Sequence, residues 1–210
     1  MLTSLTAVLT NAIDAIVLNG YAILDDFLTP TEIASLATFA QKKWHNGDMV
    51  EAKTGKSTRT NQSIRGDYIS WLDEHDQEPA INAYFNKMQT LKQMLNAQLF
   101  MNLHELETHI ARYPVGSIYQ KHLDQFSHGN HSELQHRQLS AVLYLNQDWH
   151  ETFGGELRLY LNENEHLDIL PNAGRMVLFL SARFWHEVRP AQRERLSVTG
   201  WFRTRSMLLP

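Results

Sequence analysis

Two histidines and an aspartate are the residues of this chain whose types and spacing could do chemistry. His122 and Asp124 are separated by one residue, and His186 follows far along the chain. Because strand side chains alternate with a period of two, a His-x-Asp pair on a strand directs both side chains to one face. A distant second histidine then completes a set of two imidazoles and one carboxylate, which is the ligand set of non-haem Fe(II) oxygenases.

An arginine nine residues after His186 adds to this pattern. Arg195 offers a planar, permanently charged fork that suits the carboxylate of a keto-diacid co-substrate. With 11 histidines in the chain, the alternative for His122 and Asp124 is a surface pair with ordinary hydrogen bonds. The context favours a metal site, because His122 ends a strand-like run, His186 begins another and Arg195 opens a third. The pattern therefore predicts an iron and 2-oxoglutarate site.

Composition limits the class of protein. The 210 residues, 43% of them hydrophobic and 20% charged, predict a single globular domain over 1–210. The absence of cysteine excludes disulfides and thiolate metal sites, and it fits a cytoplasmic protein. The net charge of −4 argues against nucleic-acid partners. The pattern of apolar residues predicts neither a signal peptide nor a membrane span.

The first half of the chain reads mainly as helix. Apolar spacing predicts helices over 2–18 and 78–101, and Thr29-Pro30-Thr31-Glu32 is a good helix start. A short strand is expected over 21–24. Residues 46–62 are polar and read as a long mobile loop, which in compact domains is often a lid or binding loop. Residues 1–101 are thus expected to be mainly helical support.

The second half, 104–205, reads as strands and tight turns that form the core of the domain. We expect strands over 107–113, 118–122, 138–146, 156–160, 175–180 and from 195 onward. In the last strand one face carries an arginine, hydroxyls and a tryptophan, which suits a ligand-lined interior better than a core. The predicted fold class is therefore α+β, with the N-terminal helices buttressing a β-sandwich or barrel.

Several motifs resemble the prolyl-4-hydroxylase branch of the Fe(II)/2-oxoglutarate dioxygenases. Residues 64–71, Ile-Arg-Gly-Asp-Tyr-Ile-Ser-Trp, are similar to a segment of the hypoxia-inducible-factor prolyl hydroxylases. The same direction is indicated by Tyr144-Leu145-Asn146, Gly154-Gly155, His186-Glu187-Val188 and the stretch from Arg195 to Trp201. The resemblance spans roughly 60–205 and implies a double-stranded β-helix, or jelly roll. The chain departs from the animal enzymes at 126–135, which reads as an insertion. The histidines of the histidine-rich loop 126–136 are expected to be solvated.

The resemblance implies roles for individual residues. It makes His122, Asp124 and His186 the iron ligands, and Arg195 with Tyr144 the anchor of the far carboxylate of 2-oxoglutarate. The co-substrate pocket walls it implies are Tyr113, Tyr119, Thr199 and Trp201. Substrate-binding positions are Arg137, Arg65 and Trp71, with the 46–62 loop as the substrate clamp.

The resemblance also implies an activity. Fe(II) would be the metal, 2-oxoglutarate and O2 the co-substrates, and ascorbate a further cofactor. Bacterial members of this branch hydroxylate a proline of elongation factor Tu, so the expected reaction is C4 hydroxylation of a proline in a protein, giving succinate and CO2. Two alternatives stay open from the sequence: an oxygenase acting on a small molecule or nucleic acid, and a non-catalytic 2-oxoglutarate sensor.

Overall fold

Two antiparallel sheets face each other in the computed structural model, which describes residues 4–53, 61–76, 78–125 and 137–204. The major sheet has the strand order β1-β9-β6-β11-β4-β3-β2, and the minor sheet β5-β10-β7-β8. The major strands are β1 (Tyr21–Leu24), β2 (Val50–Glu51), β3 (Tyr68–Trp71), β4 (Leu103–Tyr113), β6 (Arg137–Tyr144), β9 (Met176–Leu180) and β11 (Arg195–Thr204). The minor strands are β5 (Tyr119–His122), β7 (Leu157–Tyr160), β8 (His166–Ile169) and β10 (His186–Val188).

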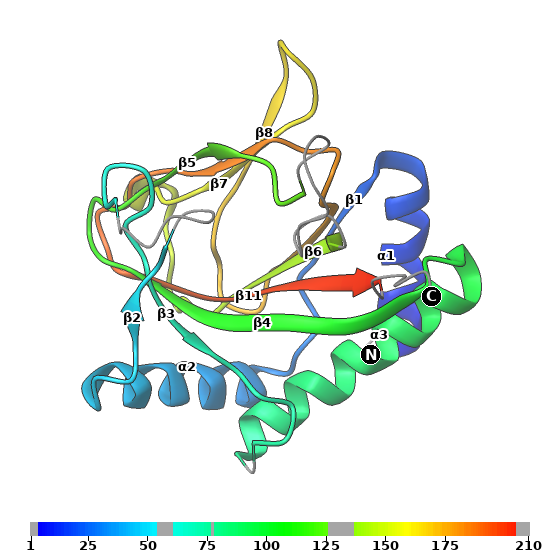
Figure 1. Cartoon of the computed structure of the whole chain (residues 1–210), viewed down its shortest axis with the longest axis horizontal. Coiled ribbons are helices and arrows are strands. Elements are labelled where there is room, and N and C mark those ends of the chain that lie inside the picture. Colours follow the sequence, from blue (N-terminus) through cyan, green and yellow to red (C-terminus); the bar gives the residue numbers. More distant parts are fainter. Residues whose placement is uncertain (1–3, 54–60, 77, 126–136, 205–210) are drawn as a thin grey trace, which may run out of the picture.

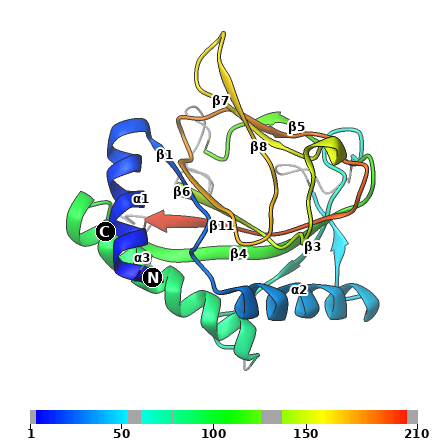
Figure 2. The same cartoon turned by 180° about the vertical axis from the view of Figure 1, so that it is seen from behind.

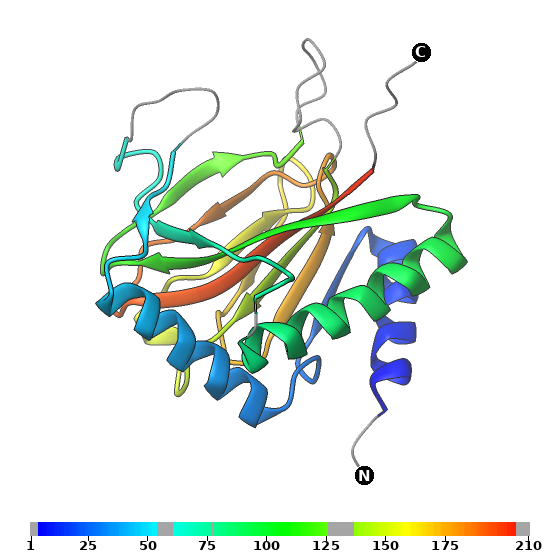
Figure 3. The same ribbon diagram turned by 60° about the horizontal axis from the view of Figure 1, so that its bottom comes forward.

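Three α-helices accompany the sheets: α1 (Leu5–Asn19), α2 (Pro30–His45) and α3 (Pro79–Leu99). A single 3-10 turn, η2, covers Glu151–Phe153 within the described residues. In Figures 1 and 2, α2 and α3 lie along one side of the long strands β4 and β11, and the minor sheet lies on the other side. Figure 3 shows β4 and β11 running side by side through the molecule.

The helix ends follow from local sequence. Gly20 adopts a left-handed φ of 85° and ends α1, as expected where no Cβ opposes that conformation. Thr29 and Glu32 form the predicted capping box at the start of α2, with the Thr29 N–H donating to Glu32 Oε2 at 2.7 Å. These caps satisfy backbone groups that would otherwise lack partners, so α1 ends at Gly20 and α2 begins after Thr29, while α3 covers Pro79–Leu99 rather than the predicted 78–101.

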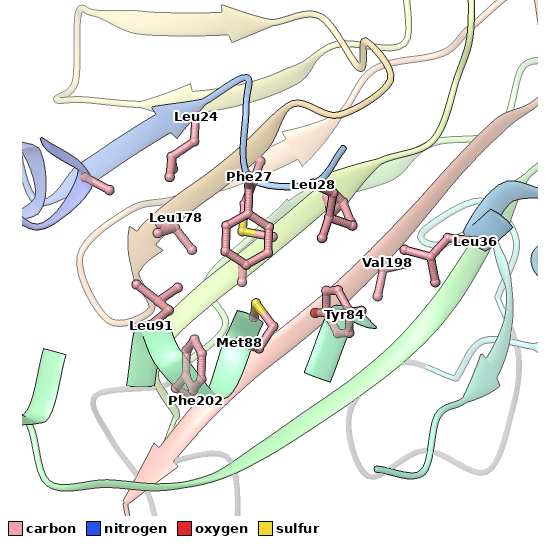
Figure 4. Close-up of a cluster of buried hydrophobic side chains, with 14 of the residues drawn as sticks. Leu24, Phe27, Leu28, Leu36, Tyr84, Met88, Leu91, Leu178, Val198 and Phe202 are labelled. Atoms are coloured by element: carbon pink, nitrogen blue, oxygen red, sulfur yellow. The ribbon is translucent and has the colours of Figure 1, made fainter. Parts of the chain in front are cut away.

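The alternation of strand β6 divides the interior into two layers. Leu139, Ala141 and Leu143 join a core cluster with residues of all three helices, part of which is drawn in Figure 4. Val142 and Tyr144 point the other way and pack between the two sheets. The alternation predicted for this strand is confirmed. Two facing antiparallel sheets with helices on one outer face are consistent with the predicted α+β jelly roll.

The N-terminal half contributes more strand than its sequence indicates. Val50–Glu51, within the stretch predicted as a loop, pairs with Tyr68–Trp71, which in turn pairs with β4. The loop prediction for 46–62 was therefore wrong at β2, and its centre, 54–60, lies outside the described residues. These strands are short, and their pairing depends on β4, a partner distant in sequence that local periodicity cannot reveal.

Two further differences lie in the C-terminal half. Strand β4 begins at Leu103 rather than 107, because its first residues pair with the end of β11. The short edge strand β8 was not predicted, since its exposed residues, such as His166 and Asp168, resemble a polar loop.

No helix in the described ranges is long and apolar enough to cross a membrane.

The buried side chain of Asn146 links three chain segments next to β11. Its Nδ2 donates to the carbonyls of Pro171, at 2.8 Å, and Leu196, at 3.1 Å. Its Oδ1 accepts the Leu196 N–H at 2.7 Å. Because these backbone groups lie beside Arg195, the same side chain fixes the first residues of β11.

Replacing Asn146 by Ala should lower the free energy of unfolding by about 2–3 kcal/mol, because several buried backbone groups lose their partners at once. The matched control is Asn162→Ala in an exposed turn, where the loss should stay below about 1 kcal/mol. Urea unfolding followed by circular dichroism measures both. Equal losses for the two variants would contradict the structural role of Asn146.

Candidate functional site

Strands β5 and β10 bring two histidines side by side. His122 at the end of β5 is paired directly with His186 at the start of β10. Their ligand atoms and a carboxylate oxygen of Asp124 all lie within 4.8 Å of one another. Each Nε2 faces the carboxylate, at 3.7 Å from Asp124 Oδ1 for His122 and 3.5 Å from Oδ2 for His186. This cluster could hold one metal ion, as the sequence predicts.

Hydrogen bonds fix the direction of each side chain in this cluster. His122 Nδ1 lies 2.7 Å from the Gln120 carbonyl, and His186 Nδ1 lies 3.1 Å from the Phe184 carbonyl. Because a carbonyl only accepts, each Nδ1 carries the proton and each Nε2 keeps a lone pair. The ring of Tyr119 stacks on His122 with 3.6 Å between centroids, which holds that imidazole in place.

Asp124 reaches the cluster in a different way from the one that its spacing suggests. β5 ends at His122, so Asp124 lies beyond the strand and the expected common strand face does not place it. Instead Ser140 of β6 donates its hydroxyl to Asp124 Oδ2 at 2.7 Å. Ser140 Oγ also lies 2.9 Å from Ser181 Oγ, which completes a buried hydroxyl pair. The major sheet therefore positions the carboxylate.

The electrostatics of the cluster favour metal binding. Burial, together with the neighbouring His186, lowers the pKa of His122 to about 3. Burial alone would raise the pKa of Asp124, but His186 and His122 outweigh it and hold this pKa at about 2. At neutral pH His122 is therefore a neutral imidazole and Asp124 an ionised carboxylate. These are the forms that coordinate a divalent metal.

Arg195 lies at the opposite end of the space between the sheets. It is 2% exposed, with its guanidinium 4.5 Å from the ring centre of Tyr113 and 5.4 Å from that of Tyr144. One of its nitrogens donates to the Gly155 carbonyl at 3.1 Å. Within the described residues its Nε and the Tyr144 hydroxyl have no hydrogen-bond partner.

This arrangement suits an external carboxylate. Buried charges and polar groups are normally paired, so unpartnered donors beside Arg195 indicate a ligand that brings its own negative charge. Burial raises the pKa of Tyr144 to about 12, which keeps its hydroxyl a donor at neutral pH. The residues present therefore fit the far carboxylate of a keto-diacid.

A cavity between the sheets joins the two ends. An inner space of about 40 Å³ is lined by the metal-binding cluster, by Arg195 and by Tyr113, Tyr119, Thr199 and Trp201. An outer cleft of about 440 Å³ shares several of these walls and adds Trp71 and Arg137. Tyr144 does not line either space and is buried next to Arg195. Apart from Tyr144, every site residue predicted from the sequence borders this inner cavity or the outer cleft.

The three residues expected to contact substrate lie at the outer cleft, but two of them already have charged partners. Arg65 forms a two-point ion pair with Asp67, at 2.7 and 2.9 Å, and lies over the Tyr119 ring. Arg137 pairs with Glu107 at 3.1 Å and stacks 3.6 Å from the Trp201 ring centre. Trp71, 53% exposed, is the open part of the rim. These arginines form the wall of the cleft.

Sequence reasoning missed one polar residue of the cavity. His109 on β4 lines both the inner cavity and the outer cleft. Burial, with Arg65 and Arg137 nearby, lowers its pKa well below the usual value. Strand alternation puts His109 on the same face as Tyr113, but only the pairing of β4 with β11 and β3 places this face at the cavity. The histidine-rich stretch 126–136 lies outside the described residues.

Comparison with known proteins points in one direction. The model of the 2OG-Fe(II) oxygenase superfamily matches residues 108–203. A Pseudomonas putida prolyl-4-hydroxylase structure is 38% identical and superposes with a TM-score of 0.84, covering 94% of this chain and 100% of that one. A Trichoplax adhaerens prolyl hydroxylase, solved with a peptide of the hypoxia-inducible-factor oxygen degradation domain, is 27% identical with a TM-score of 0.83, covering 93% of this chain and 88% of that one.

The human protein Egl nine homolog 1 is 29% identical over 198 residues, which is 88% of this chain and 44% of that protein. The chain spans about half the length of the mammalian Egl nine relatives that it matches. The family match contains the His-x-Asp, the second histidine and Arg195, and the bacterial relative is matched over its whole length. The chain therefore belongs to the 2OG-Fe(II) oxygenase superfamily.

Proposed function

We propose that this chain hydroxylates C4 of a proline in a protein substrate, using 2-oxoglutarate and O2 and releasing succinate and CO2. One observation carries the proposal: a cluster of two imidazoles and one carboxylate shares a cavity with a buried arginine that has an unpartnered nitrogen. This combination suits a metal ion and a dicarboxylate held together. Similarity to prolyl hydroxylases supports proline as the target residue.

Specific residues would bind the metal ion and the co-substrate. His122, Asp124 and His186 would bind Fe(II) through two Nε2 atoms and a carboxylate oxygen. Arg195 would bind the far carboxylate of 2-oxoglutarate, with the Tyr144 hydroxyl donating to it. Tyr113, Tyr119, Thr199 and Trp201 would wall this pocket and exclude water. Bound Fe(II) and 2-oxoglutarate would supply the oxidising chemistry that inserts one oxygen atom of O2 into a C–H bond.

A protein substrate is supported by the outer cleft. At about 440 Å³ it is far larger than the inner cavity, and it opens beside Trp71, Arg65 and Arg137. The Trichoplax relative was solved with a peptide.

We propose elongation factor Tu as the substrate and 46–62 as the segment that closes on it. We further propose that residues 1–210 act as one catalytic domain, buttressed by its helices. Ascorbate binding and a cytoplasmic location stay predictions.

Mass spectrometry of elongation factor Tu tests the substrate directly. Cells that contain this gene should carry a proline heavier by one oxygen atom, and cells that lack it should not. Purified enzyme with Fe(II), 2-oxoglutarate and O2 should install the same modification. Release of succinate without modification of the protein would favour a small-molecule or nucleic-acid substrate. Binding of 2-oxoglutarate without succinate release would favour a sensor.

Replacing Arg195 by Lys should raise the KM for 2-oxoglutarate roughly tenfold or more, because a charge-assisted hydrogen bond contributes about 1.5–3 kcal/mol and lysine lacks the planar fork. The matched control is Arg193→Lys, two residues away and exposed. Initial rates of succinate formation at varied 2-oxoglutarate measure both. An unchanged KM in the Arg195 variant would place the carboxylate elsewhere.

Replacing Ser140 by Ala should weaken divalent-metal binding about tenfold, because hydrogen bonds to a ligating carboxylate typically affect metal affinity by about 10–100-fold. Anaerobic titration calorimetry with Fe(II) or Mn(II) measures this affinity without turnover. Ser70→Ala is the control, since Ser70 is a buried serine paired with Ile110, whose side chain packs in the helix-side core. Wild-type affinity in the Ser140 variant would show that this hydroxyl does not position Asp124.

A further inference from the structure

Cross-strand pairing arranges the inner face of the major sheet in rows. Arg195 pairs with Tyr113 at the deep end, and Trp201 pairs with Glu107 toward the outer cleft. Between them, Thr199 is flanked by His109 on β4 and by Val142 on β6. His109 thus lies on the row between the carboxylate-binding end and the rim.

The row of His109 extends to the rim of the outer cleft. Its other neighbour is Trp71 of β3, which is half exposed. The imidazole lies 5.0 Å from the Trp71 ring centre and 5.4 Å from that of Trp201. These two rings fix the imidazole, and its edge is therefore the part available to a ligand in the cavity.

The hydrogen bonding of His109 is incomplete. The side chain is 1% exposed, yet its Nδ1 has no partner in the part of the chain that the structure describes. Buried polar atoms are almost always hydrogen-bonded, so a histidine that only filled the core would have a carbonyl or hydroxyl beside it. His109 is also not a member of the His122, Asp124 and His186 cluster. A ligand that enters the cavity could supply this partner.

The chemistry of a bound proline restricts what that ligand offers. Proline has no backbone N–H, so at the target residue itself the peptide backbone offers only an acceptor, its carbonyl oxygen. A neutral imidazole carries one N–H and can donate it to such an oxygen. The two arginines of the cleft are less free to make this contact, because Arg65 already pairs with Asp67 and Arg137 with Glu107.

We propose that His109 is a substrate-binding residue that donates a hydrogen bond to a backbone carbonyl next to the target proline and so orients the residue toward the metal cluster. This inference rests on the proposed prolyl hydroxylation. It assigns substrate recognition to a residue on β4, between the pocket for 2-oxoglutarate and the rim at Trp71.

Peptide binding tests the proposal without turnover. Protein loaded with Mn(II) and 2-oxoglutarate is titrated, in the absence of O2, with a proline-containing peptide of elongation factor Tu. His109→Leu should weaken peptide binding about tenfold while the affinity for 2-oxoglutarate stays within about twofold, as expected for one lost buried hydrogen bond. His109→Asn places an amide near Nδ1 and should recover most of the binding. His104→Leu, on the same strand but exposed, is the matched control and should bind as wild type.

Turnover with Fe(II) gives an independent readout. A poorly oriented proline should let 2-oxoglutarate be consumed without hydroxylation, so the ratio of succinate to hydroxyproline should rise in His109→Leu and return toward one in His109→Asn. If the leucine variant binds the peptide and couples turnover like wild type, or loses both ligands equally, the role of His109 is overturned. If the wild-type enzyme itself neither binds nor hydroxylates the peptide, the proposed function is overturned and this inference with it.

Discussion

The pairing of His186 with His122 is the constraint on which the site depends. Successive side chains of a strand point to opposite faces, so a slip of one residue between β10 and β5 would turn one imidazole out of the cavity. β10 also pairs with β7, with His186 opposite Leu159, which fixes this register from the other side. The register between β10 and β5 shifts between His186 and Val188. The direct pairing of the two histidines therefore does not extend unchanged along the two strands.

Buried polar groups in this molecule fall into two classes. One class is satisfied internally: the Nδ1 atoms of His122 and His186 face carbonyls, and Asp124 accepts from Ser140. The other class has unpartnered atoms among the described residues, and two of the several residues that carry them, Arg195 and His109, line the same cavity. Because an unpaired buried polar atom costs free energy, we infer that Arg195 and His109 serve ligand binding rather than stability.

The cleft combines permanent charge with a nearly fixed shape. Arg65 and Arg137 each bond a carboxylate through two nitrogens and each lies over an aromatic ring, Tyr119 or Trp201. Such paired and stacked side chains have little freedom to rearrange, so the walls are formed before a ligand binds. Of Arg65, Arg137 and Trp71, only Trp71 is largely exposed. Recognition would therefore combine a rigid wall with one open aromatic surface.

The sequence by itself determined the donor atoms and the local elements: His122, Asp124, His186 and Arg195, the capping box of α2 and the alternation of β6. Residue type and short-range spacing carry this information. The tertiary structure alone decided how Asp124, beyond the end of β5, is held, that Val50–Glu51 is a strand, and that His109 faces the cavity. Each of these depends on a partner far along the chain, Ser140, β3 or Thr199, and pairing between distant segments leaves no periodic signal in either segment.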